Sequence, residues 1–332
     1  MKKLLLTGLT GFVFSTGSLL ADWVTVAKET VSKLELRRGR AARSGLGLTG
    51  CIAVLILLAA FSPPAGAWVE TRLNDPFTDG ADTDGADPLD TNWYGLESAI
   101  DSGLPPTVDG GTLVTRIHDA ALGEFKSVTL AFPGDYVEVS ADIRSVNTLA
   151  DATDSGWVLG LFNSRGTPLT YDIDSNGGDT APVADDDGYW VTKFVDGDDT
   201  TDDFLIKEAV DKLRGGIFQW EDTTLSTTGT GINATDESSH EIGLRITLAD
   251  NRADLEVYAW FDTYNTTYTY VGGATGSVGL TFDEVVIGGA SGQSDLQTRI
   301  DNILVTTNVP EPASAALVLL GAAAMLNRRR RR

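Results

Sequence analysis

Acidic and aromatic residues alternate with apolar ones along residues 254–262, a spacing that suits contact with a sugar. Successive side chains of a β-strand point to opposite faces of a sheet. As a strand, this segment has one apolar face, made of Leu255, Val257, Ala259 and Phe261. Its other face carries Asp254, Glu256, Tyr258, Trp260 and Asp262. An aromatic ring can stack on the C–H face of a sugar while carboxylates accept protons from its hydroxyl groups. The candidate glycan-binding residues are therefore Glu256, Tyr258, Trp260 and Asp262, unless a loop or the partner sheet covers the two rings.

The same strand offers a pair of carboxylates for glycoside hydrolysis. Asp254 and Glu256 stand two residues apart on one face, about 6.6 Å along the strand, within the range that glycosidase carboxyl pairs span. Two acids on a solvated face are ordinary, so we expect a protein that is not an enzyme and keep a glycosidase as the alternative. His118 and His240 lie far apart in the sequence without a serine-nucleophile motif, which favours surface or turn positions over a catalytic base.

A glycine-rich segment with many carboxylates occupies residues 78–90. The five-residue unit TDGAD occurs twice in succession, and Pro88-Leu89-Asp90 follows. Hard oxygen ligands of the kind that calcium needs come from Asp79, Asp82, Asp84, Asp87 and Asp90. The spacing does not fit an EF-hand loop, which places its glycine and its terminal glutamate elsewhere. The segment predicts either a calcium site or a solvated acidic turn.

Alternation with period two recurs through the body of the chain and predicts antiparallel sheets. Residues 136–146 and 241–250 both alternate apolar and polar side chains, the pattern of half-buried strands. Turn residues at 250–253 join the second of these to the 254–262 segment as a hairpin. Further strands are expected at 112–117, 125–132, 157–162, 189–195, 282–287 and 298–306. Residues 203–214 are the best helix candidate, and the predicted fold class is an all-β, two-sheet antiparallel β-sandwich.

The chain is strongly acidic. It has 47 acidic and 25 basic residues and a net charge of −22. A body of this charge repels the phosphate backbone of nucleic acids, which excludes nucleic acid as a partner. The single cysteine is Cys51, so disulfides, zinc–thiolate sites and cysteine nucleophiles are excluded from the rest of the chain.

Basic residues precede a short apolar run near the amino end. Arg37, Arg38, Arg40 and Arg43 are followed by the apolar residues 51–61 and then by Ala65-Gly66-Ala67. These are the three parts of a secretory signal that is cut before Trp68. Residues 1–21 have the same form, so two signal-like segments stand in tandem. An uncut anchor with a long cytoplasmic tail is the alternative, although the run is short for a membrane span.

The carboxyl end combines prolines, an uncharged apolar run and five arginines. Residues 313–327 would cover roughly 22 Å as a helix, which is shorter than the ~30 Å hydrocarbon core but workable where long arginines reach back to the headgroups. The positive-inside rule would hold the terminal residues in the cytoplasm, namely Arg328, Arg329, Arg330, Arg331 and Arg332. The prolines of Val309, Pro310, Glu311 and Pro312 keep the preceding peptide extended.

Pro310-Glu311-Pro312, the small-residue apolar helix and the arginine tail together resemble the PEP-CTERM sorting signal of Gram-negative bacteria. The resemblance covers residues 309–332, and the three parts occur in order. It implies a transient membrane anchor and processing by exosortase, a membrane enzyme that cleaves near the motif. It also implies export through the inner membrane to the cell surface or extracellular matrix, in association with exopolysaccharide.

The texture of residues 68–308 resembles the concanavalin A-like jelly roll, the group of laminin-G domains, lectins and glucanases. The resemblance lies in the hairpin HEIGLRITLADNRADLEVYAWFD, the segment LTFDEVVIGG and the closing strand RIDNILVTT. The Glu-x-Asp-x-x-Glu signature of the laminarinase-like members is missing. We therefore expect a secretory signal region in 1–67, one β-sandwich in 68–308 and the sorting signal in 309–332. The sandwich is expected to contact a glycan or the matrix; a purely structural surface protein and a glycoside hydrolase are the alternatives.

Overall fold

The structure is a computed structural model, and the residues that it describes all belong to one compact unit, residues 63–317. The described residues are 69–82, 89–96, 106–116, 120–146, 155–173, 183, 185–195, 203–209, 223–229, 238–252, 254–270, 279–290 and 297–309. The predicted secretory signal region and residues 310–332 of the predicted sorting signal lie outside them. Within the described ranges, no helix is long and apolar enough to cross a membrane.

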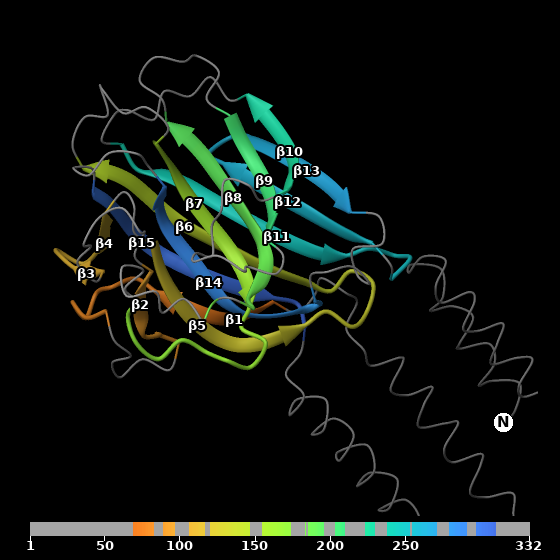
Figure 1. The fold of residues 1–332 in the computed structure, drawn as a ribbon, viewed down its shortest axis with the longest axis horizontal. Coiled ribbons are helices and arrows are strands. Elements are labelled where there is room, and N and C mark those ends of the chain that lie inside the picture. Colours follow the sequence, from red (N-terminus) through yellow and green to blue (C-terminus); the bar gives the residue numbers. More distant parts are fainter. Residues whose placement is uncertain are drawn as a thin grey trace, which may run out of the picture. The chain divides into compact units, whose positions relative to one another are not determined.

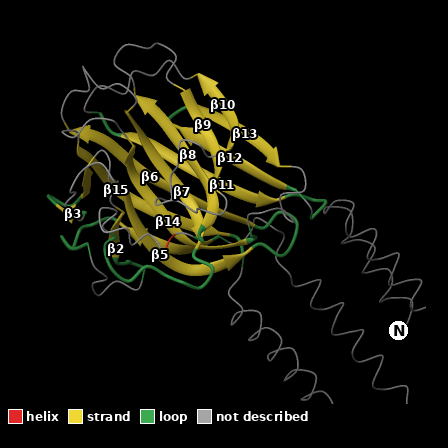
Figure 2. Cartoon of the chain, viewed as in Figure 1, coloured by secondary structure: helices red, strands yellow, loops and turns green. Residues whose placement is uncertain are grey.

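Two antiparallel sheets make up the body (Figures 1 and 2). Sheet A has the order β13-β12-β11-β6-β15-β4-β3, and β1 pairs with β15 outside that path. Its strands are β1 (Glu70–Asp75), β3 (Thr107–Val108), β4 (Leu113–Arg116), β6 (Tyr136–Val146), β11 (His240–Leu248), β12 (Leu255–Phe261), β13 (Tyr264–Tyr270) and β15 (Gln297–Thr307). Sheet B has the order β10-β9-β8-β7-β14-β5-β2. Its strands are β2 (Trp93–Leu96), β5 (Ala120–Thr129), β7 (Ser155–Asn163), β8 (Asp187–Val195), β9 (Asp203–Ala209), β10 (Thr223–Gly229) and β14 (Thr281–Ala290).

The hydrophobic core lies between the two sheets because each strand turns its apolar row inward. On β6 the row is Val137, Val139, Ala141 and Ile143, all fully or almost fully buried. The alternating residues of β11 face the same core, with Leu244 directly opposite Val139. Truncating one such leucine to alanine costs about 2–5 kcal/mol. This arrangement confirms the predicted fold class, a two-sheet antiparallel β-sandwich of the jelly-roll type.

The predicted strands are confirmed, but the predicted helix at 203–214 is wrong. Residues 203–209 form β9, which pairs with β8 on one side and β10 on the other. Phe204 and Ile206 are fully buried in the inter-sheet core. Pairing on both edges and the burial of alternate side chains outweigh the local helix preference of this short segment. Residues 210–214 lie outside the described residues.

Residues 169–173 cover part of the outer face of sheet B, and we call them the covering segment. Leu169 and Ile173 pack with Phe162 and Trp190 in a second buried apolar cluster. The segment is fastened to β2, because the Gly95 N–H donates to Asp172 Oδ1 at 2.7 Å and the Ile173 N–H donates to the Gly95 carbonyl at 2.9 Å. Sheet B is therefore buried on both faces along these strands.

The end of the described chain is tied to its beginning. β15 pairs with β1, and beyond it the Val309 N–H donates to Thr307 Oγ1 at 3.0 Å. Arg72 Nη2 of β1 donates to the Val309 carbonyl, also at 3.0 Å. The sandwich is therefore held together up to the residue that precedes Pro310 in the sequence.

Candidate functional site

Tyr258 and Trp260 stand on the outer face of sheet A. β12 buries its apolar row completely, from Leu255 to Phe261, whereas Tyr258 and Trp260 are half-buried and Glu256 is exposed. The structure thus separates the two rows of this strand as the period-two alternation predicts. The two rings are not part of the inter-sheet core.

The indole of Trp260 lies flat on the neighbouring strand. Gly243 of β11 is its direct cross-strand partner. A Cβ at position 243 would overlap the Cε2 and Cζ2 atoms of the indole. The indole Nε1–H donates to Glu241 Oε1 at 2.8 Å. A glycine below the ring and a hydrogen bond at its edge therefore fix the indole parallel to the sheet.

Tyr258 extends this surface. Its ring centroid is 5.7 Å from that of Trp260, and the two ring planes differ by 27°. We call the two rings together the aromatic platform. Two neighbouring rings whose planes are within 27° of parallel present an apolar surface bordered by polar groups, the form to which the C–H face of a sugar ring stacks.

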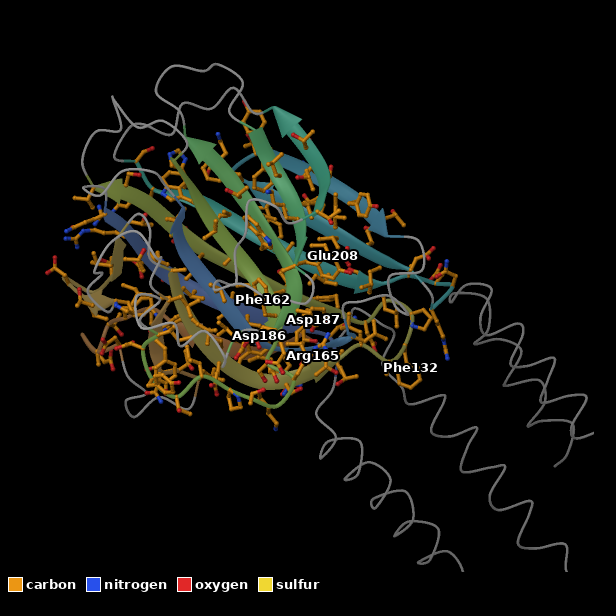
Figure 3. The ribbon with its side chains drawn as sticks, in the orientation of Figure 1. Phe132, Phe162, Arg165, Asp186, Asp187 and Glu208 are labelled. Carbon is orange, nitrogen blue, oxygen red and sulfur yellow. The ribbon has the colours of Figure 1, made fainter. Side chains whose placement is uncertain are left out.

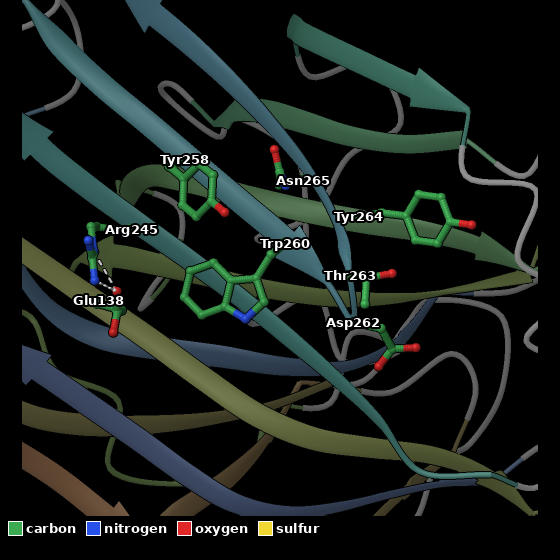
Figure 4. A pocket seen from close by; sticks show the side chains of 8 residues that line it. All are labelled: Glu138, Arg245, Tyr258, Trp260, Asp262, Thr263, Tyr264 and Asn265. Atoms are coloured by element: carbon green, nitrogen blue, oxygen red, sulfur yellow. Dashed lines mark hydrogen bonds and ion pairs between the residues drawn. The ribbon is translucent and has the colours of Figure 1, made fainter.

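Polar side chains border the platform and form a shallow hollow of about 410 Å³ (Figure 4). Arg245 lies directly opposite Tyr258 on β11 and is ion-paired with Glu138 of β6. The guanidinium carbon also lies 4.7 Å from the centre of the Tyr136 ring. The hollow is lined by Glu138, Arg245, Tyr258, Trp260, Asp262, Thr263, Tyr264 and Asn265. Hydrogen-bond donors and acceptors therefore stand beside the rings, where a sugar's hydroxyl groups would reach them.

Asp262 lies at the end of the hollow, beyond the indole in Figure 4. β12 ends at Phe261, and Asp262 has a φ of 51° in the left-handed region. Its carboxylate is already engaged: Oδ2 is 2.7 Å from His240 Nδ1, and Oδ1 accepts from the Glu241 N–H at 2.9 Å. Asp262 therefore anchors the turn, and its lone pairs are only partly available to a ligand.

The remaining acids of the segment do not join the hollow. Glu256 is exposed and lies opposite Thr247 and Thr269. Asp254 precedes β12, and its Oδ2 accepts from the Asn251 side-chain amide in the hairpin turn. The pair Asp254 and Glu256, which was considered for glycoside hydrolysis, therefore divides between a turn contact and an exposed strand position.

His240 is buried, which makes its predicted surface or turn position wrong. It is 8% exposed at the start of β11. Its ring stacks on Phe261 at 5.1 Å between centroids and lies 5.5 Å from the Trp157 ring. The cause is the register of β11, which turns the even-numbered residues inward from its first position. His118 lies outside the described residues.

A second group of acids is buried on sheet B, directly before β8 and on β14. Asp186 and Glu284 are each 1% exposed or less, and none of their four carboxyl oxygens has a hydrogen-bond partner among the described residues. Burial raises the pKa of Asp186 to about 8, and burial together with the charge of Asp186 raises the pKa of Glu284 to about 10. Both pKa values lie above 7, so the two carboxyl groups are mainly protonated at neutral pH.

The acids beside this pair are held by other partners. Asp187 Oδ2 accepts from Arg165 at 2.8 Å and from the Gly279 N–H at 3.2 Å (Figure 3). Asp283 accepts from both the backbone and the hydroxyl of Ser164. Asp186 and Glu284 therefore lie beside these paired acids in a position that solvent does not reach.

The predicted calcium segment is only partly described. Asp79 Oδ1 accepts from the Ala81 N–H at 3.0 Å, and the Asp82 carbonyl accepts from the Trp93 N–H at 2.9 Å. Asp84 and Asp87 lie outside the described residues, and Asp90 lies at the segment's end. Within the described ranges, no three acids or histidines are grouped closely enough to hold a metal ion. Calcium at this segment stays a prediction.

The sequence patterns do not single out Arg245, Glu138 and Gly243 as site residues. Their roles depend on which residues face each other across β6, β11 and β12, and period-two alternation does not fix that register. One signal was present: a glycine inside a predicted strand often marks the close approach of another group. Gly243 is such a glycine.

No family model matches the chain, and no curated protein matches it. Solved structures share its architecture. Peanut lectin with a nine-residue peptide is 10% identical, with a TM-score of 0.42 over 73% of this chain and 98% of that chain. The carbohydrate recognition domain of Emp47p is 11% identical, with a TM-score of 0.43 over 72% and 97%. A protein with a galectin-like fold from Bacillus subtilis is 9% identical, with a TM-score of 0.43 over 72% and 97%. The similarity concerns the fold.

Proposed function

We propose that the body of this protein binds a glycan on the aromatic platform. The observation that carries the proposal is the indole of Trp260, which lies flat over Gly243 beside the ring of Tyr258. A large ring held flat on the outside of a sheet contributes little to the core, and a glycine is needed beneath it. Both facts fit a surface arranged for stacking.

The charges around the platform favour a neutral glycan. Arg245 is already ion-paired with Glu138, so the nearby positive charge is neutralised. Glu241 and Asp262 add carboxylates at the other end of the indole. An anionic polysaccharide would meet repulsion here, whereas neutral hydroxyl groups find acceptors.

The geometry supports binding better than glycoside hydrolysis. Asp254 is committed to the hairpin turn, and Asp186 and Glu284 are buried away from solvent. A hydrolase would need a carboxyl pair that flanks a bound sugar. The alternative is a surface protein with a purely structural role. It differs from our proposal because it predicts that no ligand binds to the platform.

Glycan retention by Trp260→Ala and wild-type protein tests the proposal. We expect wild type to bind neutral glycans on an array. Trp260→Ala should bind about tenfold more weakly or worse, because loss of a stacked ring removes about 1.4 kcal/mol or more of binding free energy. Trp260→Ala should cost only about 1 kcal/mol of stability, whereas Phe261→Ala on the core face should cost about 3–5 kcal/mol. An array without any hit, or a collapse of the melting temperature in Trp260→Ala, would contradict the platform.

We further propose that the body is exported and sorted to the cell surface through the PEP-CTERM-like residues 309–332, with exosortase as the processing partner. The support is the tie between Arg72 and Val309, which closes the folded body directly before Pro310. A processing enzyme could then reach the proline-containing peptide without unfolding a strand.

A further inference from the structure

A serine, a histidine and an aspartate form a continuous hydrogen-bonded chain at the start of β11. Ser238 Oγ lies 3.0 Å from His240 Nε2, and His240 Nδ1 lies 2.7 Å from Asp262 Oδ2. Both distances lie within the roughly 2.6–3.2 Å over which a nucleophile and its base, and a base and its orienting group, hydrogen-bond. We propose that Ser238, His240 and Asp262 form a nucleophilic site that hydrolyses small carboxylic esters.

The partners of the ring assign its tautomer. An ionised Asp262 can only accept, so in the neutral imidazole Nδ1 carries the proton. Nε2 then offers its lone pair to the hydroxyl of Ser238. This is the arrangement in which a histidine can take the proton of a serine as the serine attacks.

The base and its orienting group are held rigidly. The His240 ring is packed against Phe261 and Trp157. Asp262 is fixed through both carboxylate oxygens, and its own N–H donates to the Glu241 carbonyl at 2.8 Å. Ser238, by contrast, is exposed at the surface. A fixed base beside an accessible hydroxyl is the division of roles that nucleophilic catalysis needs.

The reaction follows from these positions. Ser238 Oγ bonds to the acyl carbon while its proton passes to His240 Nε2, and the alcohol of the ester leaves with that proton. Water then gives a proton to Nε2 and bonds to the acyl carbon, the bond to Ser238 Oγ breaks, and Oγ regains its proton. The net change is ester plus water to carboxylic acid plus alcohol. Asp262 acts as a positioning residue through His240.

The open position of Ser238 suits a short acyl group, such as an acetyl ester, on a bulky alcohol. Asp262 also lines the hollow that contains Trp260. Since Asp262 belongs both to the hollow and to the hydrogen-bonded serine chain, the alcohol part of the substrate is a glycan that reaches from the platform past Asp262. Only the assignment of a glycan as the alcohol rests on the proposed glycan binding. Hydrolysis of a small ester needs only the hydrogen-bonded residues Ser238, His240 and Asp262.

Two readouts on the purified full chain test the site without a glycan. The first is turnover of p-nitrophenyl acetate, and the second is covalent labelling by a fluorophosphonate probe, located by mass spectrometry. We expect turnover and labelling at Ser238 in wild type, loss of both in Ser238→Ala, and retention of both in the matched neighbour Ser239→Ala. His240→Gln should lower turnover about 100-fold. Asp262→Asn should lower kcat with little change in KM.

Ser238→Ala keeps the test decisive, because Ser238 is exposed and its truncation leaves the core intact even where His240→Gln unfolds. Absence of turnover in wild type, equal labelling of Ser239, or wild-type turnover in Ser238→Ala would each overturn the proposal. Glycan retention measured in parallel separates the two proposals: a protein that binds glycans without turning over the ester refutes only the hydrolytic site.

Discussion

Trp260 rests on Gly243: the indole of β12 occupies the space that a Cβ on β11 would need. The two residues are direct cross-strand partners, so the orientation of the ring depends on the absence of a side chain from the neighbouring strand.

Gly243→Ala should therefore lift the indole from the sheet. The added methyl group would collide with the ring, and the ring, being on the outer face, can rotate into solvent. We expect loss of glycan retention with a stability change of about 1 kcal/mol or less, since glycine in a strand interior is itself unfavourable. The measurements are array binding, thermal melting and tryptophan fluorescence, which should shift to longer wavelength as the ring enters water. Unchanged fluorescence and retention would show that the contact does not position the ring.

The Asp186–Glu284 pair should make stability fall as pH rises. Each carboxyl has a folded pKa above its ordinary value near 4, so the folded state holds a proton that the unfolded chain releases. The contribution is therefore complete below pH 4 and declines up to the folded pKa values, about 8 for Asp186 and about 10 for Glu284. Thermal melts between pH 5 and pH 9 should show a decreasing melting temperature.

Glu284→Gln isolates that effect. The amide keeps a neutral hydrogen-bond donor beside Asp186, so the melting temperature of the variant should depend less on pH than that of wild type. Each 1 kcal/mol of difference corresponds to about 2–4 °C in a domain of this size. Glu256→Gln is the matched control, since Glu256 is exposed on sheet A. Parallel curves for wild type and Glu284→Gln would mean that the pair does not titrate as proposed.

Calcium binding at residues 78–90 would appear as stabilisation. A ligand that binds only the folded state raises the free energy of unfolding, by about 2.7 kcal/mol at a hundredfold excess over its Kd. We expect millimolar calcium to raise the melting temperature, a chelator to reverse the rise, and Asp79→Asn together with Asp82→Asn to abolish it. A melting temperature that ignores calcium would leave the acidic-turn interpretation in place.

Removal of residues 313–332 tests sorting. The deletion should release the body as a soluble periplasmic or secreted protein, because it removes the one apolar run after Trp68 that is proposed to enter the membrane. Cell fractionation shows where the truncated protein is located. Amino-terminal sequencing then identifies its first residue, which we expect to be Trp68. Retention of the truncated protein in the inner membrane would mean that an amino-terminal segment is an uncut anchor.

Local alternation made much of this architecture predictable. The faces of β6, β11 and β12 followed from period two, because a strand with one buried side must alternate. The segment 203–209 was mispredicted as a helix because its preference is local, whereas its pairing with β8 and β10 is not.

The site was less predictable because it depends on contacts between distant residues. Ser238, His240 and Asp262 meet only because β11 and β12 pair in one register and β12 ends at Phe261. Asp186 and Glu284 come from the start of β8 and from β14, and nothing in either local sequence indicates the other. Residue types and alternation could therefore identify Trp260 as a candidate site residue. They could not show that Gly243 lies beneath its ring.

The position of β15 sets the order in which this protein can be built. β15 pairs with β6 along one edge and with β4 and β1 along the other, yet among the described strands it is the last to be synthesised. Until residues 297–307 have emerged, β1 has no partner among the described strands and β4 and β6 each lack the partner on one edge, so sheet A cannot be completed. Completion of sheet A therefore comes after the synthesis of every other described strand. A chain that crosses a membrane while it is being made would reach the far side with this sheet still open.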